Sequence, residues 1–288
     1  MIPAQFDYQA PTTIDEALSL LAAHPDDAKI LAGGHSLIPA MKLRLAQPGL
    51  LVDIGRIKDL AYIREQGDQI LIGAMTTHYQ IESSTALKQS CPLLPECASH
   101  IGDVQVRNKG TIGGSLAHSD PAGDWPAAAI ALGAVMVAVG QTGERFIKAD
   151  EFFVDLLSTA LQPREILREI RIRKGTGRFG HAYQKVPHPA SGFAVVGVAI
   201  NLSFGDDGLC ESSSIGITGV ASKAYRATNV ESALNGKQLD EQTISAAAIH
   251  ASDGVDANSD LYASEEYRRH LAKVHTRRAI QAAASRAH

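Results

Sequence analysis

The sequence has few cysteines, no block of like charges and no apolar run long enough for a membrane helix. Its three cysteines, Cys91, Cys97 and Cys210, form no CxxC pair. Together with the absence of an apolar leader at the N-terminus, this predicts reduced thiols in a cytoplasmic protein. The eleven histidines are scattered without the short paired spacings that metal ligands need, so no intrinsic metal site is expected.

Two further absences argue against nucleic-acid binding and against a membrane span. The formal net charge is −4, and no Lys/Arg stripe with interleaved aromatics occurs, so nucleic acid is not an expected partner. The longest apolar run, residues 125–140, is shorter than the roughly 20 residues that a membrane helix needs. It predicts a buried helix at 126–134 followed by a strand at 135–140, in a soluble protein with no membrane span.

The 288 residues exceed one typical domain of roughly 100 to 200 residues. A Thr cap, an acidic first turn and helical spacing predict a helix over 12–24. A meander of strands followed by helices in the second half indicates an α+β protein.

The boundary between two domains is expected in the glycine-containing stretch after residue 173, which gives domains at 1–176 and 177–288. Strands are expected at 28–33, 49–55, 69–77, 165–173 (half-exposed), 181–186, 192–204 and 212–220. A helical tail with a basic face is expected at 267–287.

Two segments with a glycine pair and adjacent hydroxyl residues stand out: AGGHS at 32–36 and TIGGS at 111–115. Glycine pairs let the backbone approach a ligand and turn successive N–H groups toward one point, a nest for phosphate. Ser36, Thr111 and Ser115 add hydroxyl groups. Either pair alone could be a tight turn, but two such loops, the first at the carboxyl end of a strand, favour one shared diphosphate ligand.

Three other motifs are weaker. GTGRFG at 175–180 fits GxGxxG but is followed by a strand pattern, so a linker is favoured over a Rossmann site. His118, Ser119 and Asp120 are close in sequence, yet no GxSxG elbow supports a hydrolase. His35 could be a general base, a covalent flavin anchor or a neutral donor to phosphate, and the last is favoured because no partnered carboxylate is visible.

Asp124 and Lys185 each have two interpretations. Asp124 precedes the predicted helix and could cap it, or it could accept hydrogen bonds from ligand hydroxyls, or do both. Lys185, in the strand pattern HAYQKV, could be an ordinary surface lysine or could bring positive charge to a cofactor. The histidines at 100, 118, 181 and 188 are expected to be structural or surface residues.

Five stretches together resemble a known family: AGGHSLIPAMKLRLAQP, VDIG, IGAMTTH, VRNKGTIGGSLAHSDPAGDWPAAAIALGA and YRRHLAKVHTRRAI. They are similar, in order and over essentially the whole chain, to the FAD-binding medium subunit of carbon monoxide dehydrogenase and other molybdenum hydroxylases of the xanthine dehydrogenase family. The resemblance implies a two-part FAD-binding domain of the vanillyl-alcohol-oxidase (PCMH) type. A smaller C-terminal domain of antiparallel sheet and helices would follow, with non-covalent FAD between the two.

The resemblance also implies site residues. No catalytic residue and no metal ligand is expected on this chain. Asp124 would contact FAD, Leu167 would be an apolar contact beside the flavin, and Lys185 would place positive charge near the ring. The cofactor-binding residues that the resemblance implies are Ala32, Gly33, Gly34, His35, Ser36, Leu37, Thr111, Ile112, Gly113, Gly114, Ser115, Asp124, Leu167 and Lys185.

The partners follow from the same resemblance. A large subunit would carry the molybdenum cofactor and a small subunit two [2Fe–2S] clusters, in a dimer of heterotrimers. Three unpaired cysteines cannot supply the four thiolates of such a cluster. This chain would take electrons from a cluster onto FAD and pass them to an external acceptor.

Two positions depart from the family pattern. Phe193 stands where carbon monoxide dehydrogenase has a tyrosine beside the flavin, which weakens any assignment of carbon monoxide as substrate. Ser115 stands where Asn is common, which should change one hydrogen bond. A free-standing FAD oxidoreductase and a non-catalytic assembly protein remain as alternatives, although no general base or substrate-anchoring arginine stands out in the sequence.

Overall fold

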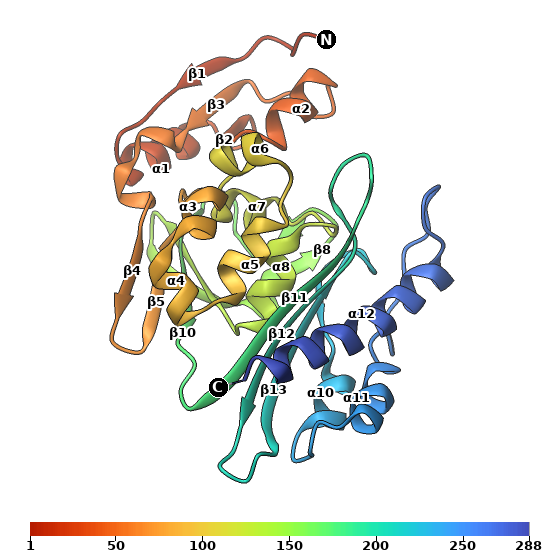
Figure 1. The fold of residues 1–288 in the computed structure, drawn as a ribbon. Coiled ribbons are helices and arrows are strands. Elements are labelled where there is room, and N and C mark those ends of the chain that lie inside the picture. The colour runs from red at the N-terminus through yellow and green to blue at the C-terminus, as the bar shows by residue number, and fades with distance from the viewer. Residues whose placement is uncertain (288) are drawn as a thin grey trace.

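The computed structural model describes residues 1–287. Its N-terminal part begins with a small parallel sheet (Figure 1). Its elements are β1 (Asp7–Gln9), α1 (Ile14–Ala23), β2 (Ala28–Leu31), α2 (Leu37–Lys42), β3 (Leu50–Asp53) and two 3-10 turns, Ile54–Arg56 and Lys58–Leu60. The strand order is β1-β3-β2. The predicted helix α1 is confirmed, with the Thr13 hydroxyl accepting a hydrogen bond from the Glu16 N–H at 3.2 Å.

A five-stranded antiparallel sheet and a group of short helices form the second part. The strands are β4 (Ile63–Gln66), β5 (Gln69–Gly73), β6 (Val135–Gly140), β7 (Gly143–Lys148) and β10 (Ile166–Arg173). The helices are α3 (His78–Ser83), α4 (Thr85–Ser90), α5 (Leu93–Ser99), α6 (Val104–Lys109), α7 (Ile112–His118), α8 (Asp124–Ala131) and α9 (Ala149–Phe152), and a hairpin of β8 (Phe153–Asp155) and β9 (Ser158–Thr159) follows. The sheet order is β4-β5-β10-β6-β7.

Strand β10 is the central strand of that sheet. Ile170 pairs with Ile72 of β5 on one side and with Met136 of β6 on the other. The expectation of a half-exposed strand is therefore wrong, because its alternating charged residues are partly enclosed. Glu169 is only 4% exposed, and its carboxylate accepts hydrogen bonds from the Tyr62 hydroxyl and the Arg171 guanidinium.

The C-terminal part is a four-stranded antiparallel sheet covered by helices. Its elements are β11 (Arg178–Pro187), β12 (Ala194–Phe204), β13 (Cys210–Thr218), β14 (Tyr225–Arg226), α10 (Thr228–Leu234), α11 (Glu241–Ala248) and α12 (Glu265–Ser285). The sheet order is β11-β12-β13-β14. Residues 174–177 connect β10 to β11, and 178–180 already lie in a strand, so the GxGxxG stretch does not open a helix. The predicted domain boundary at 176/177 falls in this connection and stays a prediction.

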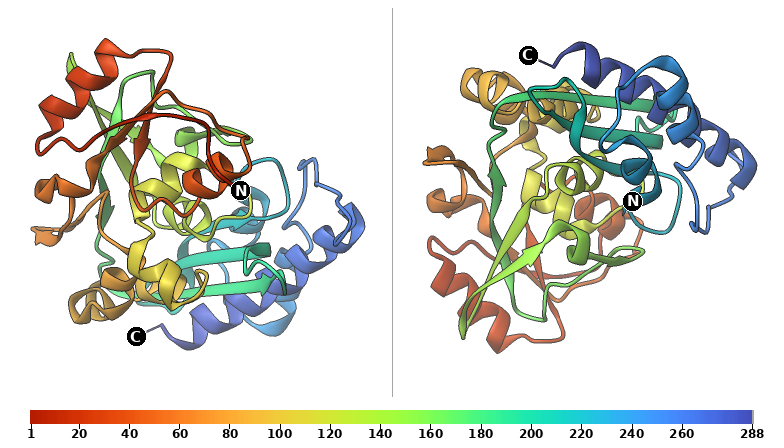
Figure 2. Two further views of the ribbon diagram at one scale, coloured as in Figure 1. Left: turned by 90° about the horizontal axis from the view of Figure 1, so that it is seen from above. Right: turned by 90° about the horizontal axis from the view of Figure 1, so that it is seen from below.

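Helix α8 joins the two halves of the molecule. All eight of its residues are buried, and it packs on β12 and β13 as well as on α5 and α7. The Cβ that Gly216 of β13 lacks would lie 2.1 Å from the backbone oxygen of Ala127, so sheet and helix are in backbone contact. The opposite face of the sheet is covered by α12, which lies across β11 and β12 (Figure 2).

Both the α+β class and the order of domains are therefore as predicted. Within residues 1–287, no helix has the length and apolar character needed to cross a membrane.

His181 on β11 is buried without any polar partner. The residue is 6% exposed, and neither ring nitrogen has a hydrogen-bond partner within residues 1–287. Burial lowers its pKa from 6.5 to about 4. It is thus a structural histidine, as expected, which the fold keeps neutral.

We predict that His181→Leu reduces the loss of stability in acid. Between about pH 6.5 and pH 4, His181 binds a proton in the unfolded chain but stays neutral in the folded chain. The free energy of unfolding therefore falls as the pH falls through that window. Removing His181 should reduce the slope by up to about 1.4 kcal/mol per pH unit. Urea unfolding at several pH values measures this slope, and a slope in His181→Leu equal to that of the native chain would contradict the prediction.

Candidate functional site

The first glycine segment, residues 32–36, leads from the end of β2 into α2. Gly34 has a φ of +77°, a left-handed conformation that glycine adopts without steric cost. The backbone N–H groups of residues 33–36 have no hydrogen-bond acceptor within the described chain, and the Ser36 hydroxyl does not cap α2. A run of free N–H groups at a glycine-containing bend is the kind of donor site that binds anions.

The second glycine pair lies in the first turn of α7 and not in a loop, which corrects the expectation. The N–H groups of residues 112–114 all donate within the protein, to the carbonyls of Thr76 and Ala74 and to the Thr111 hydroxyl. Only the first segment therefore keeps the free N–H groups of a nest. The second segment can offer hydroxyl groups, at Thr111 and Ser115, and a close backbone surface.

The two glycine segments meet. A Cβ atom on Gly33 would lie 2.3 Å from the Lys109 carbonyl oxygen and 2.7 Å from the Gly110 Cα, distances that no side chain permits. A Cβ on Gly114 would lie 3.3 Å from the Cβ of Ala32. The fold thus brings residues 32–36 and 109–115 to one place, as the hypothesis of one shared ligand requires.

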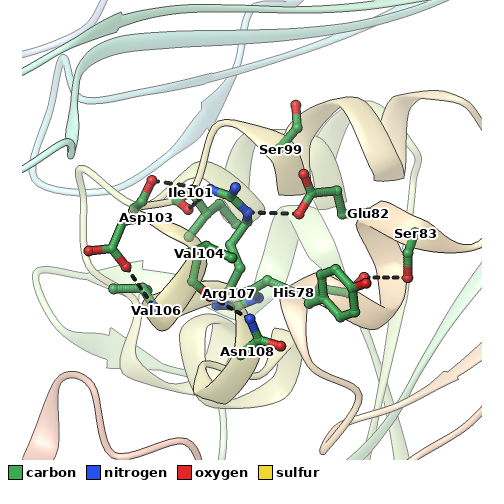
Figure 3. Close-up of polar contacts among 12 residues, drawn as sticks. His78, Glu82, Ser83, Ser99, Ile101, Asp103, Val104, Val106, Arg107 and Asn108 are labelled. Atoms are coloured by element: carbon green, nitrogen blue, oxygen red, sulfur yellow. Dashed lines mark hydrogen bonds and ion pairs between the residues drawn. The ribbon is translucent and has the colours of Figure 1, made fainter.

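Helix α6, which ends at this junction, is tied to its neighbours by Arg107 (Figure 3). The Arg107 Nε donates to Glu82 of α3 at 2.7 Å, and Nη1 donates to the carbonyls of Ile101 and Gly102 at 3.1 and 3.2 Å. The Asp103 carboxylate caps the helix by accepting from the Val106 N–H at 2.8 Å. These contacts fix the position of the chain that packs on Gly33.

His78, the first residue of α3, was not identified as a site residue from the sequence. It is 4% exposed, and its Nδ1 accepts a hydrogen bond from the Trp125 indole N–H at 3.0 Å. Its pKa is lowered to about 4, first by burial and then by the positive charges of His35 and Arg107. The motif IGAMTTH contains it, but only the fold shows that its ring borders Gly110.

Asp124 and Lys185 form a buried ion pair. The Lys185 Nζ lies 2.8 Å from an Asp124 carboxylate oxygen, and the two side chains are 1% and 5% exposed. The Tyr183 hydroxyl donates to the same carboxylate at 2.5 Å, and Lys185 also donates to the His100 carbonyl at 2.8 Å. Burial raises the pKa of the Asp124 carboxyl, and the Lys185 ammonium opposes that rise.

This pair corrects two interpretations. Asp124 does not cap α8, because Gly123 is the N-cap residue and no side chain caps the helix. Lys185 is not a surface lysine. Its ammonium is paired at close range with the Asp124 carboxylate, and the charge that it would bring to a cofactor stays a prediction.

The remaining predicted residues are spread over the same part of the fold. His35 is exposed and Leu37 is partly buried. Leu167 of β10 is buried in the hydrophobic cluster that also contains Ile112. No hydrogen bond or ion pair within residues 1–287 joins Asp124 or Lys185 to the glycine segments. Phe193, just before β12, is 44% exposed.

The residues at the junction fit the diphosphate of FAD. The free N–H groups of residues 33–36 match an anion in chemistry, and the missing side chain of Gly33 lets this segment pack directly on the backbone of Lys109 and Gly110. The hydroxyls of Ser36, Thr111 and Ser115 are further donors. The three cysteines are free and buried, and no cluster of three metal-ligating side chains occurs within residues 1–287.

Two family models match the sequence. Residues 4–173 match the FAD binding domain in molybdopterin dehydrogenase, and residues 181–283 match the CO dehydrogenase flavoprotein C-terminal domain.

Relatives match over almost their full length. The carbon monoxide dehydrogenase medium chain of Hydrogenophaga pseudoflava is 40% identical over 286 residues, 99% of both chains. Subunit alpha of the 6-hydroxypseudooxynicotine dehydrogenase complex of Paenarthrobacter nicotinovorans is 36% identical over 287 residues, 100% of this chain and 97% of that one. A chain of the solved Hydrogenophaga pseudoflava carbon monoxide dehydrogenase that lacks the Mo-pyranopterin moiety superposes with a TM-score of 0.97 and 41% identity, covering 100% of both chains.

We predict that Lys185→Met lowers the free energy of unfolding by about 3–5 kcal/mol, because it leaves the Asp124 carboxylate buried without a countercharge. The double variant Asp124→Asn, Lys185→Met should recover much of that loss, since no charge then remains buried. Urea unfolding at pH 7 measures both. Lys174→Met, which breaks the more exposed pair with Glu65, should cost less than about 1 kcal/mol. A double variant no more stable than Lys185→Met would contradict the assignment.

Proposed function

Because the chain belongs to the family of FAD-binding subunits of molybdenum-containing dehydrogenases, we propose that it is the electron-transfer flavoprotein subunit of a molybdenum hydroxylase complex. The single observation that carries this proposal is the junction of the two glycine segments, where free N–H groups lie beside the close backbone contact of Gly33 with Lys109 and Gly110. Bound FAD would supply the redox chemistry, accepting electrons and passing them on.

We assign the diphosphate of FAD to residues 32–37 and 111–115. The N–H groups of residues 33–36 would donate to its oxygens, while Ile112 and Gly113 hold α7 against the chain after β5. Asp124, Leu167 and Lys185 complete the proposed site beyond the diphosphate. Because Lys185 is already paired with Asp124, we propose that the two act as a fixed dipole in the wall of the site.

The partners that fit this role are a large subunit with the molybdenum cofactor and a small subunit with [2Fe–2S] clusters, assembled as a dimer of heterotrimers in the cytoplasm. Three buried, dispersed cysteines cannot hold a four-thiolate cluster, so the iron–sulfur centres belong to a partner. Electrons would leave to an external acceptor.

The substrate is expected to be set by the partner that holds molybdenum. Relatives of similar identity are named for carbon monoxide and for 6-hydroxypseudooxynicotine, so the medium subunit alone does not define the substrate. Phe193 offers no hydroxyl at the flavin, and we assign it only an apolar shielding role.

We predict that Gly33→Val abolishes FAD retention, because the new side chain would collide with the Lys109 carbonyl and push the two segments apart. The ratio of flavin to protein absorbance of the purified full chain measures retention. Ala61→Val, at an exposed position outside both glycine segments, should keep the native ratio. Full flavin content in Gly33→Val would contradict the location of the diphosphate.

A second experiment tests the role as a subunit. Affinity purification of the chain from its native cell, followed by a visible spectrum and metal analysis, should yield flavin, iron, molybdenum and two further chains. A chain that elutes alone with FAD and oxidises a small molecule unaided would instead favour a free-standing FAD oxidoreductase.

A further inference from the structure

The ring of His78 is locked in one tautomer by Trp125. An indole N–H can only donate a hydrogen bond, so the Nδ1 atom that it contacts at 3.0 Å must be an unprotonated acceptor. A neutral imidazole then carries its hydrogen on Nε2. Because His78 is only 4% exposed, its ring is held in place and the Nε2–H donor has a defined direction.

That Nε2 donor has no protein acceptor. No hydrogen bond from Nε2 is found within residues 1–287, yet this atom is not among the polar atoms sealed without a partner, as both ring nitrogens of His181 are. The Nε2–H group thus has no protein acceptor but is not fully covered by protein atoms. Such a group costs free energy unless water or a ligand accepts its hydrogen bond.

The position of Nε2 connects it to the glycine junction. A Cβ on Gly110 would lie 2.6 Å from His78 Nε2, so only a glycine allows this approach. The Gly110 Cα also lies 2.7 Å from where a Cβ on Gly33 of the first segment would stand. His35 is near enough for its charge to affect His78. The donor therefore borders the place where the free N–H groups of residues 33–36 lie.

We propose that His78 is a further FAD-binding residue, which donates its Nε2–H to the diphosphate while Trp125 holds the ring in the required tautomer. The inference rests on the proposed FAD site. Trp125 is a positioning residue in this scheme, since it acts through His78.

The charged groups around His78 favour a neutral donor. The groups that act on it are His35 in the first segment and Arg107 of α6, and both disfavour a second proton on the ring. With a pKa lowered to about 4, His78 is neutral at physiological pH. It would thus add a hydrogen bond to the anion without adding a charge.

Two substitutions separate the two ring nitrogens. His78→Asn places an amide oxygen near the Nδ1 position, which keeps an acceptor for Trp125 but removes the donor at Nε2. His78→Gln places an amide NH2 near the Nε2 position and keeps that donor. Both variants are made in the full chain and freed of flavin, and FAD and ADP are titrated into each. ADP carries the same diphosphate without the flavin ring.

We expect His78→Asn to weaken FAD and ADP by a similar factor, about 10- to 100-fold for a lost hydrogen bond to a charged group. His78→Gln should stay within about threefold of the native chain. Trp125 is the only tryptophan, so its emission spectrum shows whether the surroundings of the pair are intact in each variant.

The outcomes distinguish this inference from the proposed function. If the native chain binds FAD and His78→Asn binds it equally well, the His78 contact is wrong and the flavoprotein assignment stands. If His78→Asn weakens FAD but not ADP, the contact is not to the diphosphate and the inference is wrong. If the native chain binds no FAD, both proposals fail.

A measurement on the native chain does not depend on folding of a variant. Among the eleven histidines, the ring that accepts from the Trp125 indole N–H is His78, and its 15N spectrum at pH 7 should show the hydrogen on Nε2 and resonances that move when FAD is added. A His78 ring that is protonated on Nδ1 or on both nitrogens would overturn the proposal.

Discussion

Close backbone contact at the junction of residues 32–36 with 109–115 is the constraint on which the site depends. Gly33 approaches the Lys109 carbonyl so closely that a single added carbon would collide with it. The contact is maintained from both sides: the parallel sheet delivers the first segment at the end of β2, and Arg107 ties α6 to α3 through Glu82. Because Gly33 has no side chain, the two segments pack backbone to backbone, and the N–H groups of residues 33–36 keep no acceptor within the described residues.

Helix α8 connects this junction with the C-terminal sheet. Its first residue, Asp124, pairs with Lys185 and Tyr183 of β11, while its second, Trp125, donates to His78 beside the glycine segments. Two neighbouring residues thus link the FAD-binding half and the C-terminal half. All of α8 is buried, so a displacement of the helix would disturb both polar contacts together with the core.

The electrostatics of the proposed site differ from what single residues suggest. Lys185 is one half of a buried pair, and His78 is held neutral by burial and by nearby positive charge. The first segment contributes backbone N–H dipoles. A site built in this way binds an anion mainly by directed hydrogen bonds, which fix the orientation of the ligand better than mobile surface charges do.

The sequence by itself determined the α+β class, the helix capped by Thr13, most strands and the two glycine segments, because these depend on local periodicity, capping and glycine content. The tertiary structure alone decided that the second glycine pair begins a helix, that β10 is a central strand, and that Asp124 pairs with Lys185. It also decided that His78 faces Gly110. These features depend on contacts between residues far apart in the chain, and local patterns carry no information about which distant groups compete for a hydrogen bond or for burial.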